Sequence, residues 1–344
     1  MTEPVETVLE NHVAAFLMRH QAAAQWSDPR MAVALSGGID SMVLLDILYR
    51  LHNQSPAPSF ELEAIHVNHG ISPNADRWAE FCKAECARRH IPITVEVVTV
   101  DRNSGAGLEA AAREARYAAL IKTPVAIILV AQHQDDQAET VLHQMLRGTG
   151  LNGLAAMGEA RALSTTPSTT ASTTQTLLRP LLTIRREAIE AYAKVRALQW
   201  IEDESNTDTA YTRNYIRHTL MPVIAQRFPH YADSLARTAQ HAADSAALND
   251  ALARIDLKWN GAEAFADALD TLSSSRQINA LYYWLRWQNI TSVSRAQLQA
   301  WAAQLFRAAP DSKPHQAGGH DFVIRRQHHR LILITQLAKL IIDD

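Results

Sequence analysis

Cysteine, aromatic residues and long apolar runs are all scarce in this sequence. Two cysteines in 344 residues cannot form the disulfide framework of a small secreted protein. The longest apolar run, Val125–Ala131, is far shorter than the roughly 18 residues that a membrane span needs. The N-terminal residues MTEPVETVLE lack the basic start and apolar core of a secretory signal. These absences predict a cytoplasmic protein with no membrane segment.

The sequence also lacks an excess of positive charge. Its formal net charge is −3 with 15 histidines counted as neutral, which argues against nucleic-acid binding through charge spread over the whole surface. Local basic patches are still allowed, because phosphate affinity depends on clusters rather than totals. With 47% hydrophobic and 20% charged residues the chain can bury a core, and its length predicts two or three domains.

Short apolar runs alternate with helical patterns in the first part of the chain. A helix is expected over residues 4–20. Four apolar runs follow, at Met31–Leu35, Leu62–Val67, Ile93–Val100 and Val125–Val130. Helical patterns then begin near Asp40, Pro73, Leu108 and Asp135. This alternation predicts βαβ units and an α/β domain with a parallel, Rossmann-like sheet, with ligands outside the carboxyl ends of the strands.

The remainder of the chain has a different character. Residues Ser164–Thr176, STTPSTTASTTQT, have no apolar periodicity and predict a flexible surface loop. From about Ser205 the pattern is mainly helical, and two short β runs at Phe322–Ile324 and Leu331–Ile334 predict a closing hairpin. We therefore expect an α/β domain over residues 1–224 and a mostly helical domain ending in a β-hairpin over residues 225–344.

A glycine-containing loop follows the first predicted strand. Ser36-Gly37-Gly38-Ile39-Asp40-Ser41, hereafter the phosphate loop, leads directly into a helix. Close backbone approach at glycine, unpaired N–H groups and the helix dipole together favour phosphate. The loop lacks the Gly-Lys-Ser/Thr ending of a Walker motif and the spacing of G-x-G-x-x-G. It resembles the pyrophosphate loop of the ATP pyrophosphatases, which split ATP between the α and β phosphates.

An acidic helix is predicted after the fourth strand. Asp135, Glu139 and His143 recur every four residues and therefore share one face, with Asp136 beside them. Such carboxylates can hold Mg²⁺ near a bound triphosphate or bind a cationic amine. Simple capping of the helix start is the alternative interpretation of the two aspartates.

Five segments together give the sequence a narrower resemblance. They are AQHQDDQAETVLHQMLRGTGLNGLAAM at residues 131–157, HVNHG at 66–70, LEAAAREARY at 108–117, RPLL at 179–182 and EDESNTDTAYTRNYIRHTLMP at 202–222. In this order they resemble the tRNA(Ile)-lysidine synthetase family, over roughly residues 31–222. The C-terminal third is similar to the family's helical tRNA-binding domain. Longer members carry a further small C-terminal domain, which we expect to be absent here.

The resemblance implies a reaction with ATP, Mg²⁺, free L-lysine and an isoleucine tRNA with a CAU anticodon. ATP adenylates the C2 oxygen of the wobble cytidine and pyrophosphate leaves. The ε-amine of lysine then attacks C2 and AMP leaves. The product, lysidine, pairs with A instead of G, and the amino acid charged onto the tRNA changes from methionine to isoleucine. The sequence leaves the oligomeric state open.

The resemblance also implies residue roles. The residues expected to bind ATP are Ser36, Gly37, Gly38, Ile39, Asp40, Ser41 and His66. Asp40, Arg113 and Asp136 are expected to be catalytic: Asp40 ligates Mg²⁺ or takes a proton from the lysine amine, and Arg113 stabilises charge on the α-phosphate or the cytidine. The expected lysine ligands are Asp135, Asp136 and Glu139, and the expected metal ligands are Asp40 and Asp135. The expected tRNA contacts are Arg213, Asn214, Arg217, Arg325, Arg326 and Arg330.

Simpler structural interpretations stand beside these roles. Arg113 and Arg116 could belong to an exposed helix face with Glu109 and Glu114, or Arg116 could pair with a nearby carboxylate. Residues 213–217 could cap against Asp203 and Asp208, and residues 325–330 could form a solvated hairpin tip.

Two other functions compete with lysidine formation. A tRNA thiolase with the same loop would need reactive cysteines, but Cys82 and Cys86 lie four apart in a predicted helix with no Cys-x-x-Cys motif. A noncatalytic nucleotide-binding module would have no need for an acidic helix beside the phosphate loop.

Overall fold

The computed structural model of the chain describes residues 3–24, 30–54, 60–101, 107–163, 175–204, 208–260, 264–266, 269–306, 315–318, 322–327 and 330–335. The chain divides into two compact units, residues Met1–Gln240 and His241–Asp344. This division falls inside a long helix, later than the predicted boundary at residue 224. Within the described ranges, no helix has both the length and the apolarity that a membrane crossing requires.

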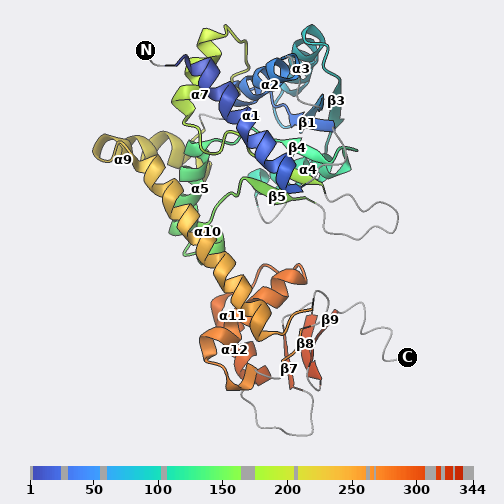
Figure 1. Cartoon of the computed structure of the whole chain (residues 1–344), viewed down its shortest axis with the longest axis vertical. Coiled ribbons are helices and arrows are strands. Elements are labelled where there is room, and N and C mark those ends of the chain that lie inside the picture. Colours follow the sequence, from blue (N-terminus) through green and yellow to red (C-terminus); the bar gives the residue numbers. More distant parts are fainter. Residues whose placement is uncertain are drawn as a thin grey trace. The chain divides into compact units, whose positions relative to one another are not determined.

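The first unit contains a six-stranded sheet in the order β3-β2-β1-β4-β6-β5. Figure 1 labels four of these strands, β1, β3, β4 and β5. All neighbouring strands are parallel except β5 and β6, which are antiparallel. The strands are β1 (Arg30–Ala34), β2 (Glu61–Asn68), β3 (Ile93–Val97), β4 (Ile127–Leu129), β5 (Ala160–Ala162) and β6 (Thr176–Leu178). The four strands predicted from apolar runs and the parallel α/β class are confirmed.

Alternating side chains of the strands face two separate apolar clusters. In β1, Met31 and Val33 join the larger cluster while Ala32 packs into the smaller one. In β4, Leu129 faces the larger cluster and Ile128 the smaller. Because successive strand residues point to opposite faces, this pattern shows a sheet that is buried on both sides.

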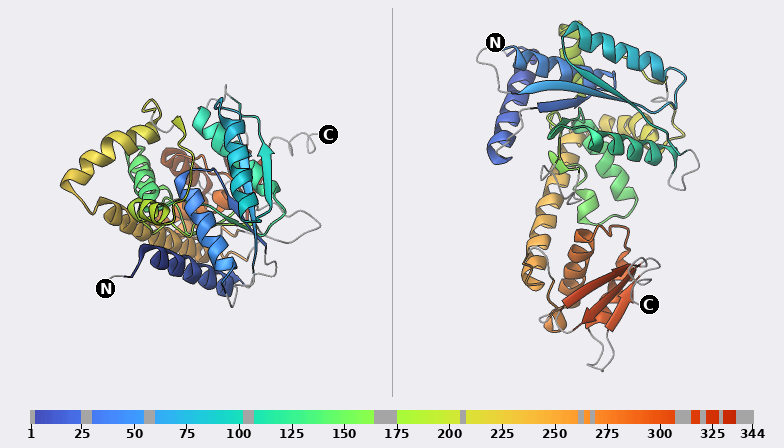
Figure 2. Two further views of the ribbon diagram at one scale, coloured as in Figure 1. Left: turned by 90° about the horizontal axis from the view of Figure 1, so that it is seen from above. Right: turned by 90° about the vertical axis from the view of Figure 1, so that its right-hand side faces the viewer.

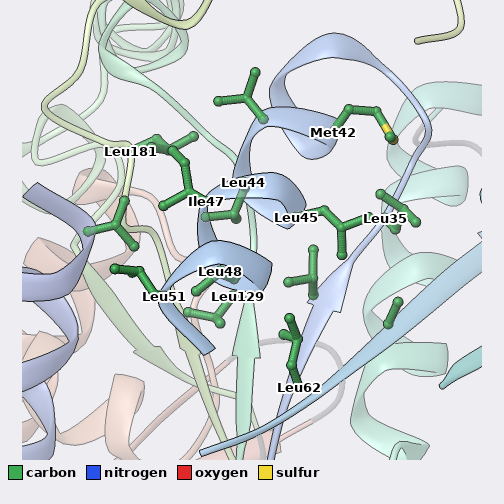
Figure 3. Close-up of a cluster of buried hydrophobic side chains, with 14 of the residues drawn as sticks. Leu35, Met42, Leu44, Leu45, Ile47, Leu48, Leu51, Leu62, Leu129 and Leu181 are labelled. Carbon is green, nitrogen blue, oxygen red and sulfur yellow. The ribbon is translucent and has the colours of Figure 1, made fainter. Parts of the chain in front are cut away.

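Helices cover both faces of the sheet, as Figure 2 shows. The larger cluster is built with helices on one face: α1 (Val5–Ala24), α2 (Ile39–His52), α3 (Ala75–Arg88) and α7 (Arg186–Val195). On the other face Leu120 of α4 (Leu108–Lys122) packs against Ile128. Helix α2 is apolar around most of its circumference, since residues 41–48 are all buried, and its leucines fill the space above β1 and β4 (Figure 3). This burial fixes the start of α2 against the carboxyl end of β1.

A third group of helices packs around α5 (Gln134–Leu146). Its small apolar cluster includes Ala138, Ile216, Met221 and Ala232. The elements are α6 (Leu151–Leu154), α8 (Thr212–Tyr215), the π-helix η2 (Ile216–Leu220), α9 (Met221–Arg227) and the first part of α10 (Tyr231–Asp256).

The predicted Ser/Thr-rich loop is shorter at its end than expected. Residues 164–174 lie outside the described part of the chain. Gln175 is buried and its amide donates to the carbonyl oxygens of Thr123 and Val125, at 2.9 and 3.0 Å. Thr176 begins β6. Thr176 belongs to the sheet because backbone pairing with β4 outweighs its polar side chain, and Gln175 directly precedes this strand.

The second unit combines helices with a three-stranded antiparallel sheet in the order β7-β8-β9. Its elements are the end of α10, the 3₁₀ turn η3 (Leu269–Thr271), α11 (Ser274–Trp287), α12 (Arg295–Phe306), β7 (His315–Gly318), β8 (Phe322–Gln327) and β9 (Arg330–Thr335). Its core includes Trp284, Leu285 and Ile324. The predicted closing hairpin is β8–β9. Strand β7 was not predicted, because its four residues HQAG have no alternating apolar pattern.

Candidate active site

The sheet order places two sequence-distant loops at one point. Strand β1 lies between β2 and β4. The chain therefore continues from β1 to β2 and β3 on one side of β1 and places β4 on the other side. At such a switch point the loops after the two central strands open away from each other, and ligands bind between them. Here these are the phosphate loop after β1 and residues 130–133 after β4.

Serine side chains hold the phosphate loop in its conformation. The Ser41 hydroxyl accepts from Gly37 N–H at 3.2 Å and donates to the Gly38 carbonyl oxygen at 2.9 Å. It also lies 3.1 Å from the hydroxyl of Ser36, which accepts from Gly38 N–H at 3.3 Å. Among the described residues, no side chain forms a cap hydrogen bond at the start of α2. The N–H groups there and the helix dipole are therefore directed toward an anion.

Gly37 has a conformation that only glycine adopts readily. Its φ is +86°, and a Cβ there would lie 2.6 Å from Ile201 Cδ1 and 3.2 Å from Cys82 Sγ. Its carbonyl accepts from Ile201 N–H at 2.9 Å. The glycine thus permits a left-handed turn and close packing of residue 201 beneath the loop.

Asp40 and His133 bring the two loops into contact. Asp40 Oδ2 lies 3.7 Å from His133 Nε2 and 3.8 Å from Arg186 Nη1. Asp40 Oδ1 and His133 Nε2 are buried atoms without hydrogen-bond partners in the described residues. Burial raises the pKa of Asp40, and the nearby His133 and Arg186 partly oppose this rise. An unsatisfied carboxylate oxygen therefore faces the site at the start of α2.

His133 is fixed by a reciprocal cap at the start of α5. The ring Nδ1 of His133 accepts from the backbone N–H of Asp136 at 3.4 Å, while the backbone N–H of His133 donates to Asp136 Oδ2 at 3.1 Å. A ring that accepts at Nδ1 carries its proton at Nε2 when neutral, so an N–H group is directed toward Asp40. The capping interpretation of Asp136 is thus confirmed for one of its oxygens.

Arginines occupy the remaining oxygens of the acidic helix. Arg217 donates to Glu139 Oε1 at 2.6 Å, to Glu139 Oε2 at 2.9 Å and to Asp136 Oδ1 at 2.6 Å. Arg213 donates to Asp136 Oδ1 at 3.0 Å and to Glu139 Oε2 at 3.3 Å. Burial alone would raise the pKa of Asp136, but His133 and the two guanidinium groups lower it below its usual range. Arg217 lies in the π-helix, a rare geometry that often marks functional sites.

Asp135 is held by a different set of groups. Its Oδ2 accepts from the backbone N–H of Arg186 at 2.9 Å, and its Oδ1 accepts from the Tyr231 hydroxyl at 3.4 Å. Arg185 Nη2 lies 3.5 Å from the same Oδ1. The structure therefore brings Asp40, Asp135, Asp136 and Glu139 into one charged region, with an arginine close to each carboxylate.

The fit of Mg²⁺ differs between the two predicted ligands. Asp40 Oδ1 has no partner and suits a cation held mainly by phosphate oxygens, since Mg²⁺ in nucleotide sites often takes only one or two carboxylates. Asp135 fits less well because both of its oxygens are already engaged. In the described ranges, no group of three or more His, Cys, Asp and Glu side chains has the arrangement of a metal site.

The other predicted residues occupy several positions. His66 is buried at the end of β2, with Nδ1 2.8 Å from the Leu35 carbonyl oxygen, so it supports the strand that precedes the phosphate loop. Burial lowers the pKa of His66. Arg113 donates to the Tyr117 hydroxyl at 3.2 Å, and Arg116 Nε lies 3.4 Å from His69 Nε2. Among the described residues, the contact seen for Arg116 is this histidine and not a carboxylate, which was the alternative interpretation.

The predicted tRNA contacts separate into two groups. Asn214 donates to the Asp208 carbonyl oxygen at 2.9 Å, which matches the capping interpretation. In the second unit, Arg326 forms a two-pronged pair with Asp270 and is 14% exposed. Arg325 and Arg330 lie on the paired strands β8 and β9. Residues 328 and 329 lie outside the described part.

Sequence reasoning missed His133, Arg185 and Arg186. A signal for His133 was present, because an N-cap residue followed by an acid three positions later is the spacing of a capping box. No local signal marks Arg185 and Arg186, whose neighbours Asp135 and Asp40 are about 50 and 146 positions away in the sequence.

Family models match both parts of the chain. One described as a PP-loop domain matches residues 6–224, and one described as the TilS substrate binding domain matches residues 266–332. The tRNA thiolase NcsA of Methanococcus maripaludis has a similar fold, with a TM-score of 0.54 at 17% identity over 69% of this chain and 79% of that chain.

Curated relatives agree with the family models. A tRNA(Ile)-lysidine synthase of Serratia proteamaculans is 39% identical over 336 residues, 96% of this chain and 73% of the relative. Those of Azoarcus sp. and Chromobacterium violaceum are 43% and 44% identical over 83% and 74% of this chain. The chain spans 61% and 56% of the length of these two relatives. From its domain matches and its relatives, the chain belongs to the tRNA(Ile)-lysidine synthase family.

Proposed function

We propose that the protein joins lysine to C2 of the wobble cytidine of a CAU-anticodon isoleucine tRNA, at the expense of ATP. The phosphate loop at the switch point carries the proposal: it offers uncapped N–H groups at the start of α2, with the unpartnered Asp40 Oδ1 beside them. This arrangement suits a pyrophosphate group and its counterion. Family membership then selects the reaction from those that an ATP pyrophosphatase loop supports.

In the first step, residues of the phosphate loop orient ATP so that its α-phosphate meets the C2 oxygen of the cytidine. The bond between that oxygen and phosphorus forms, and the bond to pyrophosphate breaks. Ser36 and Ser41 keep the glycine backbone in place, and the amides of Ile39, Asp40 and Ser41 bind the leaving pyrophosphate. Arg113 stabilises negative charge that develops on the α-phosphate or the cytidine.

Mg²⁺ would be held by the ATP phosphates with Asp40 as its protein ligand. When bound, the ion neutralises charge on the phosphates and the leaving pyrophosphate. Asp135 supports this region through Arg186. It accepts a hydrogen bond from the backbone N–H of Arg186, and the side chain of Arg186 approaches Asp40.

In the second step, the lysine ε-nitrogen attacks C2, the bond from C2 to the adenylated oxygen breaks and AMP leaves. The ammonium must first lose a proton, for which Asp40 is the acceptor if it does not hold the metal. We assign recognition of lysine to Asp135, Asp136 and Glu139. Because arginines already contact these carboxylates, the incoming ammonium shares their oxygens with Arg213 and Arg217 or displaces these side chains.

The tRNA would contact both units. Arg213, Asn214 and Arg217 are the proposed contacts beside the reaction site, and Arg325, Arg326 and Arg330 are those in the second unit. Arg326 is already paired with Asp270, so a phosphate would compete with that carboxylate for its guanidinium. Removing Arg325, Arg326 and Arg330 together should lower the salt dependence of tRNA binding, since fewer counterions are released.

Thiolation and noncatalytic binding are less well supported. Burial raises the pKa of Cys82 to about 12 and that of Cys86 to about 11, so neither is a ready nucleophile. A module that only binds nucleotides has no use for four carboxylates next to the phosphate loop.

The test is nucleoside analysis of a CAU-anticodon tRNA(Ile) transcript after incubation with the protein, ATP, Mg²⁺ and radiolabelled lysine. Radiolabel found in a modified cytidine supports the proposal. The proposal is overturned if a parallel reaction with a sulfur donor gives a thiolated nucleoside, or if protein with titrated active sites gives no product.

The lysine assignment needs its own control. Asp136→Asn and Glu139→Gln should raise the lysine KM more than they weaken tRNA binding. Each change also removes part of the ion pairing of Arg217, however. Arg217→Met breaks the same ion pairs and keeps both carboxylates, so an equal rise in the lysine KM in this variant would show that the effect is structural.

A further inference from the structure

One group of arginines in the first unit gathers around a single aromatic ring. Arg113 of α4 and Arg161 of β5 each place their guanidinium carbon 5.1 Å from the ring centre of Tyr117 (α4 and β5 are labelled in Figure 1). Arg179, which follows β6, interacts with the Tyr117 hydroxyl. We call Arg113, Tyr117, Arg161 and Arg179 the arginine–tyrosine cluster.

The cluster has positive charge without acidic partners. In the part of the chain that the structure describes, none of its three arginines forms an ion pair with a carboxylate. The acid nearest in sequence to Arg161 is Glu159, which pairs instead with Arg19 at 2.9 Å. The positive charges of Arg113 and Arg161 lower the pKa of Arg179, in addition to the larger effect of burial. Like charges are gathered here although each raises the electrostatic energy of the others.

Arg179 is the least expected member, because its residue is only 2% exposed. It donates to the Gln132 side-chain oxygen at 2.5 Å and to the Gly158 carbonyl oxygen at 2.7 Å, both neutral acceptors. A buried charge normally lies beside an opposite charge, since the cost of desolvation is otherwise uncompensated. A fixed, buried guanidinium next to two exposed ones is therefore suited to an external anion.

The cluster lies at the same edge of the sheet as the proposed reaction site. Gln132, which fixes Arg179, directly precedes His133, whose ring lies 3.7 Å from Asp40. Arg179 itself follows β6, the neighbour of β4, at its carboxyl end. Arg161 is on the edge strand β5 and is exposed, so it can reach a ligand larger than a nucleotide.

We infer that the arginine–tyrosine cluster binds a backbone phosphodiester of the RNA substrate next to the reacting nucleoside, with Arg161 as an added contact and Arg179 as its fixed base. Paired N–H groups of arginine match two phosphate oxygens, and the tyrosine ring keeps the guanidinium planes in place. The inference rests on the proposed function for the identity of the RNA. A phosphate of ATP is the other source of the same chemistry.

The experiment measures binding of the CAU-anticodon tRNA(Ile) transcript to the full chain at several salt concentrations, without lysine or ATP. The variants are Arg161→Gln, Arg161→Lys and Arg113→Gln. Arg88→Gln is the matched control: Arg88 is exposed, lies at the end of α3 that leads away from this edge, and its partner Glu85 keeps Arg89. ATP affinity is measured for each variant in parallel.

Loss of one phosphate contact should lower the slope of log affinity against log salt by about 0.7–0.9. At 0.1 M salt this corresponds to a roughly five- to eightfold loss of affinity. Arg161→Gln and Arg113→Gln should each show this change, whereas Arg161→Lys should keep the slope and lose less affinity. The Arg88→Gln line should overlay that of the parent, and ATP affinity of Arg161→Gln should stay within twofold.

The results separate this inference from the proposed function. Lower slopes together with no lysidine would refute the function and keep the RNA-phosphate site. Normal lysidine formation by the parent, with slopes of both Gln variants equal to that of Arg88→Gln, would refute the site and keep the function. Weaker ATP binding by Arg161→Gln, with its tRNA binding unchanged, would assign the cluster to a nucleotide phosphate and also refute the inference.

Discussion

The ion pairs between Arg217 and the acidic helix offer a direct test of how burial controls electrostatic stability. Glu139 is 5% exposed in its side chain and Arg217 26%, and their two contacts are 2.6 and 2.9 Å long. On the surface the Lys83–Glu80 pair has a similar length, 2.8 Å, but its side chains are 48% and 70% exposed. The two pairs therefore differ mainly in their access to water.

Removal of one partner should matter far more in the buried pair. Arg217→Met leaves Glu139 with only Arg213 at 3.3 Å, so we expect a loss of about 2–3 kcal/mol, at the lower end for broken buried pairs because Arg213 remains. Lys83→Met should cost less than about 1 kcal/mol. In the double variant Arg217→Met/Glu139→Gln the loss should be smaller than the sum of the single losses, because no unpaired charge stays buried.

Native-state hydrogen exchange with mass spectrometry measures the loss of stability within each helix. A local measurement is needed because the two units need not unfold together. A loss of 2–3 kcal/mol corresponds to amide exchange about 30- to 150-fold faster in residues 134–146 of α5. Exchange in α3 should rise less than about fivefold for Lys83→Met. An increase below fivefold in α5 for Arg217→Met, or equal effects of the two variants, would refute the reasoning.

Three further outcomes follow from the site. Asp40→Asn should abolish lysidine formation in a protein with unchanged circular dichroism, because it removes the unpartnered carboxylate at the start of α2; near-normal turnover would remove Asp40 from the mechanism. Gly37→Ala should weaken ATP binding and destabilise the first unit by about 2–4 kcal/mol, because it adds backbone strain and a clash with Ile201. Urea unfolding of Gly37→Ala/Ile201→Val should show part of this stability restored, because the second change relieves the clash but not the strain. Burial raises the pKa of Cys86 to about 11, so at pH 8 only about one thiol in a thousand is ionised, and iodoacetamide should label Cys82 and Cys86 at least 100-fold more slowly in the native chain than in the urea-unfolded chain. Rapid labelling of the native chain would show accessible thiolates and would make sulfur chemistry a candidate again.

Local sequence patterns were sufficient for the first four strands of the first unit and for the helices that follow them. The apolar run at Met31–Leu35 and the Gly-Gly turn after it predicted a strand, a tight loop and a helix start, and β1 and α2 form there. These features are local because strand burial, glycine conformation and helix periodicity each depend on a few neighbouring residues. Short strands with weak patterns, such as β5 and β7, could not be predicted in this way because their pairing partners define them.

The partners of the charged residues were not predictable from the sequence. The spacing of Asp135, Asp136 and Glu139 placed them on one helix, but two spatial neighbours of the last two, Arg213 and Arg217, come from 74 to 81 positions later. The same holds for Arg326, which the sequence showed as part of a basic stretch and the structure pairs with Asp270. Long-range ion pairs depend on how helices pack, and packing is set by apolar faces elsewhere in the chain.

The sequence by itself therefore determined the alternation of the first four strands with helices, the phosphate loop and the presence of an acidic helix start. The tertiary structure decided that β4 lies beside β1, which brings His133 to Asp40 and makes one site of two loops nearly 100 residues apart. It also decided which charges are balanced and which, like those of the arginine–tyrosine cluster, are left without an acidic partner among the described residues. The physical reason is that hydrophobic burial and backbone pairing fix the strand order, and charged side chains then find only the neighbours that this order provides.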